Sequence, residues 1–268
     1  MMTSRELVDS AVNIAKNYKT LYVMGCFGSP LTGANVAKFC TNHSYNKQPK
    51  RTAMIKAAGN QSPPVFGFDC VCLIKAILWE WSGNASKAHG GAVYLANNVP
   101  DINANVMFSR CTEQSTNFSD IELGEALWSP GHIGIYIGNG HAVECTPSWN
   151  NCVQVTAVSN MKVVSNYPKR MWSKHGKLPY IKYAGASGAK ISKLAGAASK
   201  DNSAKNGIVF KTTAALNIRY GPDADKYDSI KVLPQGTKVT WYGYHTDKWY
   251  LVNVAGTVGY CHSSYLRK

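Results

Sequence analysis

Residues 66–74 read FGFDCVCLI, and residues 130–140 read PGHIGIYIGNG. In the first stretch, Cys70 stands directly before an apolar pattern that predicts a helix over 70–81. The start of a helix presents unpaired amides and the positive end of a dipole, which together stabilise a thiolate. We therefore expect Cys70 to be an activated nucleophile, and the alternative is a buried structural cysteine.

The second stretch predicts a strand over 133–137, with three isoleucines on one face and His132 on the other. The turn residues 138–140 lead to a predicted partner strand over 142–145. A nucleophilic thiol needs a base, and the base needs a group that orients it. His132 is the candidate base and Glu144 the candidate orienting group.

The length of this hairpin loop decides whether the two side chains meet. With a three-residue loop, Gly134 pairs with Glu144, which then shares the face of His132. With a two-residue loop, the register slips by one and Glu144 points to the opposite face.

Together these residues resemble the NlpC/P60 cysteine peptidases. The resemblance is carried by FDC at 68–70 before Leu73 and by HIGIYIGNG at 132–140. The upstream YVMG at 22–25 matches the tyrosine-and-glycine element of that family. The resemblance covers roughly residues 7–183.

The resemblance implies that Cys70 is the nucleophile, that His132 acts as general base and then acid, and that Glu144 orients the imidazole. It also implies that Tyr22 and Asp69 line the substrate site. The implied fold is α+β and papain-like, with the nucleophile on a helix packed against an antiparallel sheet. We expect no metal and no cofactor.

Some positions depart from the family pattern. Val71 and Cys72 stand where the family usually has Ser and Gly, and the third catalytic residue is more often His, Asn or Gln than Glu144. The stretch between Gly25 and Asp69 is long, and we expect one short helix in it, over 51–58. A Cys-His-Glu set also suits the related CHAP amidases and endopeptidases, so the bond that is cleaved stays open.

The remainder of the chain predicts a second domain. We expect the catalytic domain over 1–184, a flexible linker rich in Ala, Gly, Ser and Lys over 185–206, and a small all-β domain over 207–268. The five predicted strands of this last domain cover residues 215–219, 229–233, 238–244, 249–254 and 257–261.

The C-terminal residues resemble a bacterial SH3-type (SH3b) domain. The segments LNIRYGP at 216–222, LPQGTKV at 233–239, WYLV at 249–252 and GYC at 259–261 carry this resemblance. It implies binding to cell-wall peptides or glycans.

The net charge of the chain indicates which kinds of binding partner to expect. The chain of 268 residues has a net charge of +14. The part before Ser187 has 17 basic and 10 acidic residues, and the part from Ser187 onward has 12 and 5, so each is +7. This charge favours anionic wall polymers. No Arg-rich stripe interleaved with aromatics indicates nucleic acid, which we do not expect as a partner.

The start of the chain lacks the apolar core of a signal peptide, and no run reaches the roughly 18 apolar residues needed to cross a bilayer. We therefore expect no membrane insertion, eight free thiols and a monomer. We expect synthesis in the cytoplasm and release to the wall through a holin, as in phage endolysins.

The sequence thus predicts an endolysin-like peptidoglycan hydrolase that cleaves an amide bond of the stem peptide, with the γ-D-glutamyl link to the diamino acid as the expected bond. One alternative is an N-acetylmuramoyl-L-alanine amidase. An alternative from another class is a non-catalytic wall-binding protein, in which Cys70 would show no selective alkylation at neutral pH.

Overall fold

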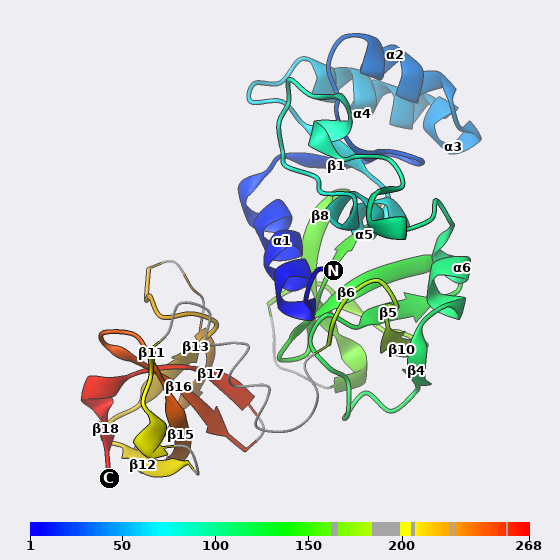
Figure 1. Ribbon diagram of the computed structural model, residues 1–268. Coiled ribbons are helices and arrows are strands. Elements are labelled where there is room, and N and C mark those ends of the chain that lie inside the picture. Colours follow the sequence, from blue (N-terminus) through cyan, green and yellow to red (C-terminus); the bar gives the residue numbers. More distant parts are fainter. Residues whose placement is uncertain (162–165, 184–198, 205–206, 226, 228, 256) are drawn as a thin grey trace. The chain divides into compact units, whose positions relative to one another are not determined.

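The computed structural model describes residues 1–268 except 162–165, 184–198, 205–206, 226, 228 and 256 (Figure 1). The chain divides into two compact units, Met1–Tyr183 and Ala184–Lys268. Each unit buries its own apolar side chains, and no cluster of buried residues in the described chain draws members from both. Either unit can therefore be considered by itself.

A seven-stranded sheet is the centre of the first unit, with strand order β4-β10-β5-β6-β7-β8-β9. Every neighbouring pair is antiparallel except β8 and β9, which are parallel. The strands are β4 (Thr112–Ser115), β5 (Ala126–Ser129), β6 (His132–Gly138), β7 (His141–Cys145), β8 (Val153–Val158), β9 (Lys169–Arg170) and β10 (Lys174–Lys177).

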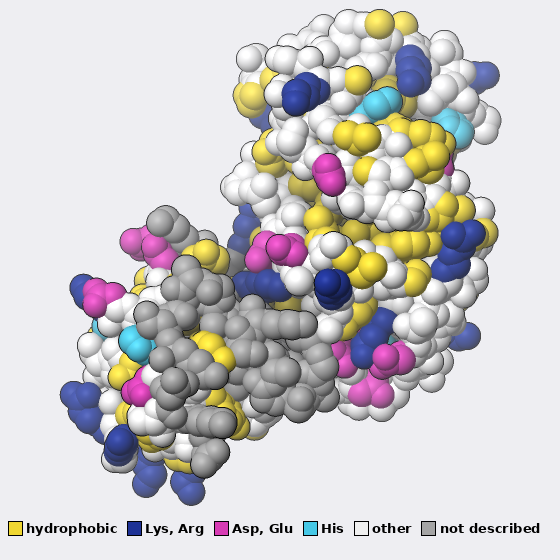
Figure 2. Space-filling model, in the orientation of Figure 1, with side chains coloured by type: hydrophobic (Ala, Val, Ile, Leu, Met, Phe, Trp, Pro, Cys, Tyr) yellow, Lys and Arg dark blue, Asp and Glu magenta, His cyan; other side chains and the backbone are white. Residues whose placement is uncertain are grey.

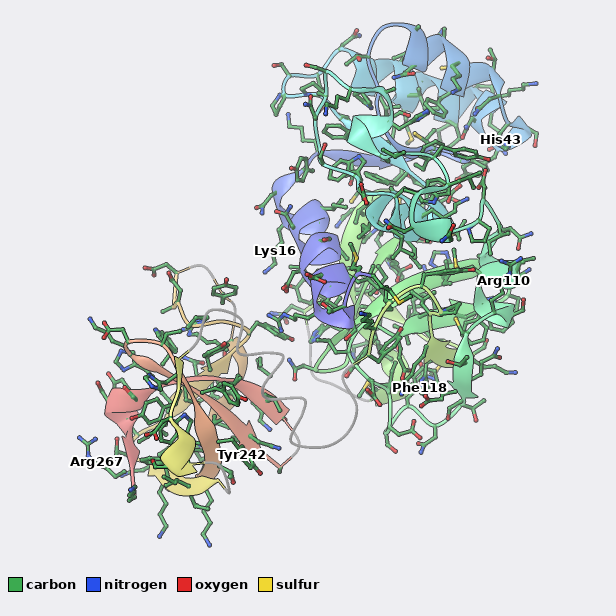
Figure 3. The ribbon with its side chains drawn as sticks, in the orientation of Figure 1. Lys16, His43, Arg110, Phe118, Tyr242 and Arg267 are labelled. Carbon is green, nitrogen blue, oxygen red and sulfur yellow. The ribbon has the colours of Figure 1, made fainter. Side chains whose placement is uncertain are left out.

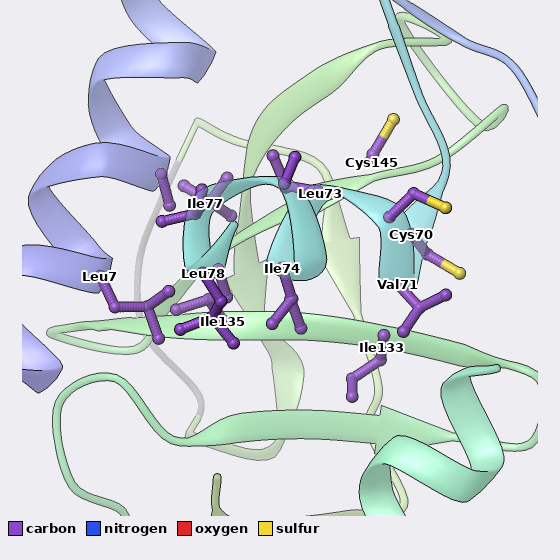
Figure 4. Close-up of a cluster of buried hydrophobic side chains, with 14 of the residues drawn as sticks. Leu7, Cys70, Val71, Leu73, Ile74, Ile77, Leu78, Ile133, Ile135 and Cys145 are labelled. Atoms are coloured by element: carbon purple, nitrogen blue, oxygen red, sulfur yellow. The ribbon is translucent and has the colours of Figure 1, made fainter. Parts of the chain in front are cut away.

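Strand β6 is buried on both faces, although its alternating sequence predicts burial of the isoleucine face alone. Ile133 and Ile135 are fully buried on the face that packs against helices α1 (Ser4–Asn17) and α5 (Cys70–Leu78) (Figure 4). Tyr136 packs on the other face, within a cluster that includes Trp172. Burying each large apolar side chain contributes about 1.5–3 kcal/mol, so this strand is a main source of stability.

Helix α5 begins at Cys70 because Asp69 caps it. The Asp69 carboxylate accepts a hydrogen bond from the Cys72 amide at 2.8 Å, and all nine residues of the helix are buried. The predicted end at residue 81 is wrong, since the helix ends at Leu78 and Glu80 has a φ of 67°. Apolar residues continue past the helix end because Trp79 is itself part of the core, so the pattern alone did not mark the boundary.

Residues 20–68 hold more structure than the single short helix that the sequence predicts. A three-stranded sheet has the order β1-β3-β2. It is accompanied by three helices: the elements are β1 (Thr20–Tyr22), β2 (Phe27–Pro30), α2 (Ala34–Thr41), α3 (Ser44–Lys47), α4 (Pro49–Gly59) and β3 (Phe66–Phe68). Helix α4 confirms the predicted helix over 51–58, and it buries Arg51 alongside Ile55 and Ala58; helices α2 and α3 and the three strands were not predicted.

Between α5 and β5 the chain forms η1 (Ala88–Gly91), η2 (Ala96–Asn98) and α6 (Ala104–Ser109), and η3 (Ser159–Met161) follows β8. No helix in the described part of the chain combines the length and the apolar character that crossing a membrane requires.

The second unit contains an antiparallel sheet with the order β14-β13-β17-β16-β15-β12-β18, and β11 pairs with β15. Its elements are β11 (Ser199–Lys200), η4 (Asn202–Ala204), β12 (Ile208–Thr212), β13 (Leu216–Arg219), β14 (Ser229–Leu233), β15 (Lys238–His245), β16 (Trp249–Val254), β17 (Thr257–His262), η5 (Ser263–Tyr265) and β18 (Leu266–Arg267). The five predicted strands correspond to β13–β17.

The predicted linker over 185–206 differs from the structure in part. Residues 184–198 and 205–206 lie outside the described residues. Residues 199–204, however, form β11 and η4, and Ala204 is buried in the core of the second unit. Small and polar residues dominate this segment, so its composition did not indicate a strand.

Two aromatic residues that the second unit buries are Trp241 and Tyr244 (5% and 8% exposed). The Trp241 ring stacks on Tyr250 at 4.4 Å between centroids. Tyr242 is only partly buried and lies on the same unit (Figure 3). Part of the aromatic content therefore fills the core, as expected for so small a domain.

Candidate active site

The β6–β7 hairpin combines the two loop lengths that the sequence left open. Gly138 pairs with His141, so the tip is the two-residue turn Asn139–Gly140, whose φ angles of 51° and 71° suit a type I′ turn. The register then shifts between Tyr136 and Gly138. This bulge restores the register of a longer loop, and it places Gly134 opposite Glu144.

His132 and Glu144 meet on one face of the sheet as a result. The Nε2 of His132 lies 2.7 Å from Oε2 of Glu144. The Glu144 side chain is fully buried, whereas the His132 side chain is 16% exposed. The contact engages Nε2, so Nδ1 is the ring nitrogen left to exchange a proton.

Two further residues hold the Glu144 carboxylate. Thr156 Oγ1 donates to Oε1 at 2.7 Å. Arg170 Nε donates to both carboxylate oxygens, at 2.9 Å to Oε1 and 2.7 Å to Oε2. Glu144, Thr156 and Arg170 come from the neighbouring strands β7, β8 and β9, so the sheet itself builds the cluster.

These contacts determine the charge of Glu144. Burial raises the pKa of the carboxyl, but the hydrogen bonds and charges of His132 and Arg170 outweigh burial and lower it below its ordinary value. Glu144 is therefore a carboxylate at neutral pH.

Trp172 supports the imidazole from the side. Its ring stacks on His132 with 5.4 Å between centroids and 9° between planes. Gly134 leaves room for this indole, since a Cβ at that position would lie 3.0 Å from Cη2 of Trp172 and 3.2 Å from the Val143 carbonyl oxygen. A side chain at position 134 would therefore press on the Trp172 indole, so glycine fits the close packing of this ring.

Cys70 lies at the first residue of α5 and contacts the start of β6 (Figure 4). Within the described chain its Sγ has one hydrogen-bond partner, the Gly131 carbonyl oxygen, at 4.0 Å. The amide of Ile133 also points to the sulfur. The thiol therefore lies against the backbone on both sides of His132, and it is 7% exposed.

The expectation of a thiolate at rest is wrong. Burial and the neighbouring Asp69 carboxylate raise the pKa of the Cys70 thiol to about 12. The amides of Ile133, Val71 and Cys70 lower that pKa but do not offset burial. The helix start does act in the expected direction; desolvation is the larger effect, so the thiol is protonated at neutral pH.

Asp69 joins two segments of the site. One carboxylate oxygen caps α5, and the other accepts a hydrogen bond from the Gly25 amide at 2.8 Å. Gly25 has a φ of 75°, and a Cβ there would lie 2.3 Å from Nε2 of His43, which is near α3 (Figure 3). Asp69 is 5% exposed, so its contact with substrate remains a prediction.

Tyr22 ends β1 close to Cys70. Burial, together with the nearby Cys70 and Asp69, raises the pKa of its hydroxyl, which is therefore a proton donor at neutral pH. Arg51 of α4 donates to the Tyr22 carbonyl and, at 2.7 Å, to Oδ1 of Asn151. The helices over 34–59 are thereby connected to the residues around Cys70.

Two other side chains near these motifs lie away from the His132–Glu144 contact. Cys72 is 3% exposed and belongs to the buried core. His141 contacts the Tyr167 ring edge to face, with 5.5 Å between centroids. In the chain outside the masked positions, all eight cysteines are free, and no group of three or more His, Cys, Asp or Glu side chains could hold a metal ion.

Sequence reasoning missed Arg170, Thr156 and Trp172. Arg170 and Trp172 alternate with the exposed Met171, which is a weak strand signal. Strand β9 has only two residues. The segment of sequence between it and its partner β8 has no strand pattern. No local feature showed that its guanidinium would reach Glu144.

Residues 214–267 match the family described as bacterial SH3 domain. No curated protein matches the chain. A solved structure described as "The crystal structure of Ly7917" covers 97% of this chain and 92% of its own, at 13% identity and a TM-score of 0.28. "The crystal structure of Ly7917 with the hydrolyzing product of MDP" covers 97% and 93%, at 13% and 0.27. Such TM-scores do not establish a shared fold.

Proposed function

We propose that the protein is a peptidoglycan hydrolase whose first unit cleaves an amide bond of the stem peptide through Cys70, His132 and Glu144. The observation that carries the proposal is the buried His132–Glu144 contact of 2.7 Å, placed beside a cysteine at a helix start. This arrangement supplies a nucleophile, a base and an orienting carboxylate. The resemblance to NlpC/P60 peptidases with a papain-like fold supports the same assignment.

Acylation begins with a protonated thiol. Because the pKa of Cys70 is about 12, His132 Nδ1 takes the thiol proton as the sulfur attacks the substrate carbonyl carbon. Glu144 accepts the Nε2 hydrogen and stabilises the imidazolium that forms. The thiol and the ring approach each other in the substrate complex, where catalytic hydrogen bonds tighten.

The tetrahedral intermediate carries its charge on the former carbonyl oxygen. Amides at the start of α5 are the proposed donors to this oxyanion, and Tyr22 and Asp69 line the substrate site. The intermediate collapses as the C–N bond breaks and imidazolium protonates the leaving amine. Water then attacks the thioester, His132 takes its proton, and the sulfur recovers a proton as the acid is released.

The γ-D-glutamyl link to the diamino acid is the proposed bond, on the NlpC/P60 resemblance. Cleavage between muramic acid and L-alanine is the rival, because Cys-His-Glu sets also suit CHAP amidases. Mass spectrometry of fragments released from purified walls separates the two, since only the amidase frees intact stem peptides from the glycan.

The SH3 domain match indicates the role of the second unit. We propose that it binds the wall, as bacterial SH3 domains do, and that it keeps the enzyme on an insoluble substrate. The net charge of +14 favours the anionic polymers of the wall. We further propose an endolysin-like route, with synthesis in the cytoplasm and release through a holin.

Replacement of the nucleophile tests the proposal. Cys70→Ser and Cys70→Ala should abolish release of soluble fragments from purified walls while pull-down of the protein by those walls is unchanged. Cys72→Ser is the matched control, because Cys72 belongs to the same helix but faces the core. Undiminished hydrolysis by both Cys70 variants would exclude this mechanism and favour a non-catalytic wall-binding protein.

A further inference from the structure

Arg170 occupies a constrained position beside the proposed catalytic pair. Its Nε donates to both oxygens of Glu144, and its Nη2 donates to Oγ1 of Thr146 at 3.2 Å. The guanidinium lies 4.9 Å from the Trp149 ring centroid and 5.5 Å from that of Trp172. A planar group with contacts at its edge and near two aromatic rings has little freedom to move.

From this geometry we infer that Arg170 is a positioning residue, which sets both the orientation and the protonation of the His132–Glu144 pair. The inference rests on the proposed function, since it assigns a role within that reaction. Arg170 acts through Glu144 and touches no reacting atom.

The orientation follows from the donors around the carboxylate. An ionised carboxylate only accepts hydrogen bonds, and Arg170 and Thr156 both donate to Glu144. The carboxylate therefore presents Oε2 to His132 as an acceptor. The Nε2 of His132 must then carry a hydrogen, which leaves Nδ1 unprotonated and able to accept the thiol proton.

The protonation follows from charge. A fully buried carboxylate beside an imidazole would, without a counter-ion, either take up a proton or hold the ring as imidazolium. The positive charge of Arg170 makes both outcomes less favourable. Arg170 and His132 are the charged groups that lower the pKa of Glu144, and the neighbouring Cys145 of β7 supplies no positive charge.

The test is a pH titration of His132 in the full chain. NMR of imidazole-labelled protein, recorded without substrate, is the readout. In Arg170→Gln the imidazolium form of His132 should persist to higher pH than in the wild type, because the cation that contacts Glu144 is lost. The acidic limb of kcat/KM for wall hydrolysis should move upward by a similar amount. Arg170→Lys should keep the titration close to wild type while kcat falls, since an ammonium retains the charge without the planar donors.

Lys169→Gln is the matched control, since it removes the same charge from the neighbouring exposed position of β9. It should change neither the titration nor the pH profile. Thermal unfolding of each variant shows whether it folds, and the Arg170→Lys variant keeps the test informative if Arg170→Gln does not.

Three results would overturn the inference: an unchanged His132 titration in Arg170→Gln, an equal shift in Lys169→Gln, or a rise in KM alone, which would make Arg170 a substrate ligand. The NMR titration needs no turnover. A shift of the His132 pKa in a protein that hydrolyses no wall would therefore refute the proposed function and leave the coupling of Arg170 to the pair intact.

Discussion

Glu144 is a fully buried side chain that also belongs to the proposed catalytic set. It accepts hydrogen bonds from His132, Thr156 and Arg170, so its charge is compensated within the sheet. Cys70 presents the opposite case, because its burial is not compensated and its thiol keeps its proton. In the proposed reaction, His132 is therefore oriented before substrate binds, whereas Cys70 loses its proton only as it attacks the substrate.

The high pKa of Cys70 predicts its reactivity toward alkylating reagents. The thiolate fraction rises tenfold per pH unit below the pKa, so iodoacetamide should modify Cys70 slowly at pH 7 and progressively faster as the pH rises. Slow alkylation at neutral pH is thus expected for the enzyme as well as for the non-catalytic alternative, and the Cys70 variants, not alkylation, separate the two. Peptide mass spectrometry over a pH series measures the alkylation of Cys70 separately from the other cysteines. A rate that is already maximal near pH 7 would show a thiolate at rest and contradict the general-base step.

Glu144→Gln tests the orienting carboxylate. The amide nitrogen of Gln cannot accept a hydrogen bond, so one of the three donors around this position loses its partner, at a cost of about 1–3 kcal/mol in stability. Turnover should fall, but less than in His132→Ala, because the imidazole remains. Parallel measurement of kcat and thermal unfolding in both variants checks this. Equal and complete loss of turnover would mean that Glu144 does more than orient.

At the scale of elements, the sheet is what brings the site together. Three successive strands supply Glu144, Thr156 and Arg170, and the bulge in β6 selects the register that puts His132 on the same face. The sheet carries a buried histidine, His175 of β10, which the proposed reaction does not use. Its Nδ1 lies 2.5 Å from Oε2 of Glu125, and its Nε2 lies 2.9 Å from the Asn117 carbonyl oxygen.

The His175–Glu125 contact should make stability depend on pH. Burial lowers the pKa of His175, but the hydrogen bonds of Glu125 and Asn117 outweigh burial and raise it. A raised folded-state pKa contributes stability that is complete below the unfolded value of about 6.5 and is lost as pH rises through the folded value. His175→Gln should therefore lower the free energy of unfolding more at pH 5.5 than at pH 9, by about 1–3 kcal/mol.

Urea unfolding at the two pH values measures this effect. Lys174→Gln, at the neighbouring exposed position of β10, is the control and should show no such difference. A loss of stability in His175→Gln that is the same at both pH values would assign the contact to packing alone.

At the scale of the whole molecule, the two units have separate cores and each part of the chain carries a charge of +7. On the face that Figure 2 shows, the Lys and Arg side chains of the first unit are spread apart and are not gathered in a single stripe. Separate cores imply that the first unit folds without the second. The proposed division of labour assigns hydrolysis to one unit and retention on the wall to the other.

Ending the chain at Tyr183 tests that division. The truncated protein should cleave a soluble stem peptide with unchanged kcat, because every residue of the proposed site precedes the cut. Its retention on purified walls should fall by about 100-fold, since the second binding contact is lost. Sedimentation with walls and peptide hydrolysis, measured in parallel, give the two numbers. Equal retention of both proteins would remove the role proposed for the SH3 domain.

Several features of the fold and the site could be predicted from short segments. The Asp69 cap with Cys70 at the helix start, the alternation along β6 and the Asn139–Gly140 turn all appear in the structure. All five predicted C-terminal strands match the observed strands to within one residue at either end, and residues 214–267 match a known family. Each of these depends on neighbours in the chain, whose preferences are written in the local sequence.

The sequence by itself therefore determined which groups could react and which segments would be helix or strand. Tertiary structure alone decided that Arg170 would reach Glu144, that helices α2 and α3 would form within residues 34–47, and that Cys70 would keep its proton. The reason is physical. Arg170 and Glu144 are 26 positions apart in the sequence, and the desolvation of the Cys70 thiol depends on the residues packed around it. Both effects arise from neighbours in space, which no pattern of adjacent residues contains.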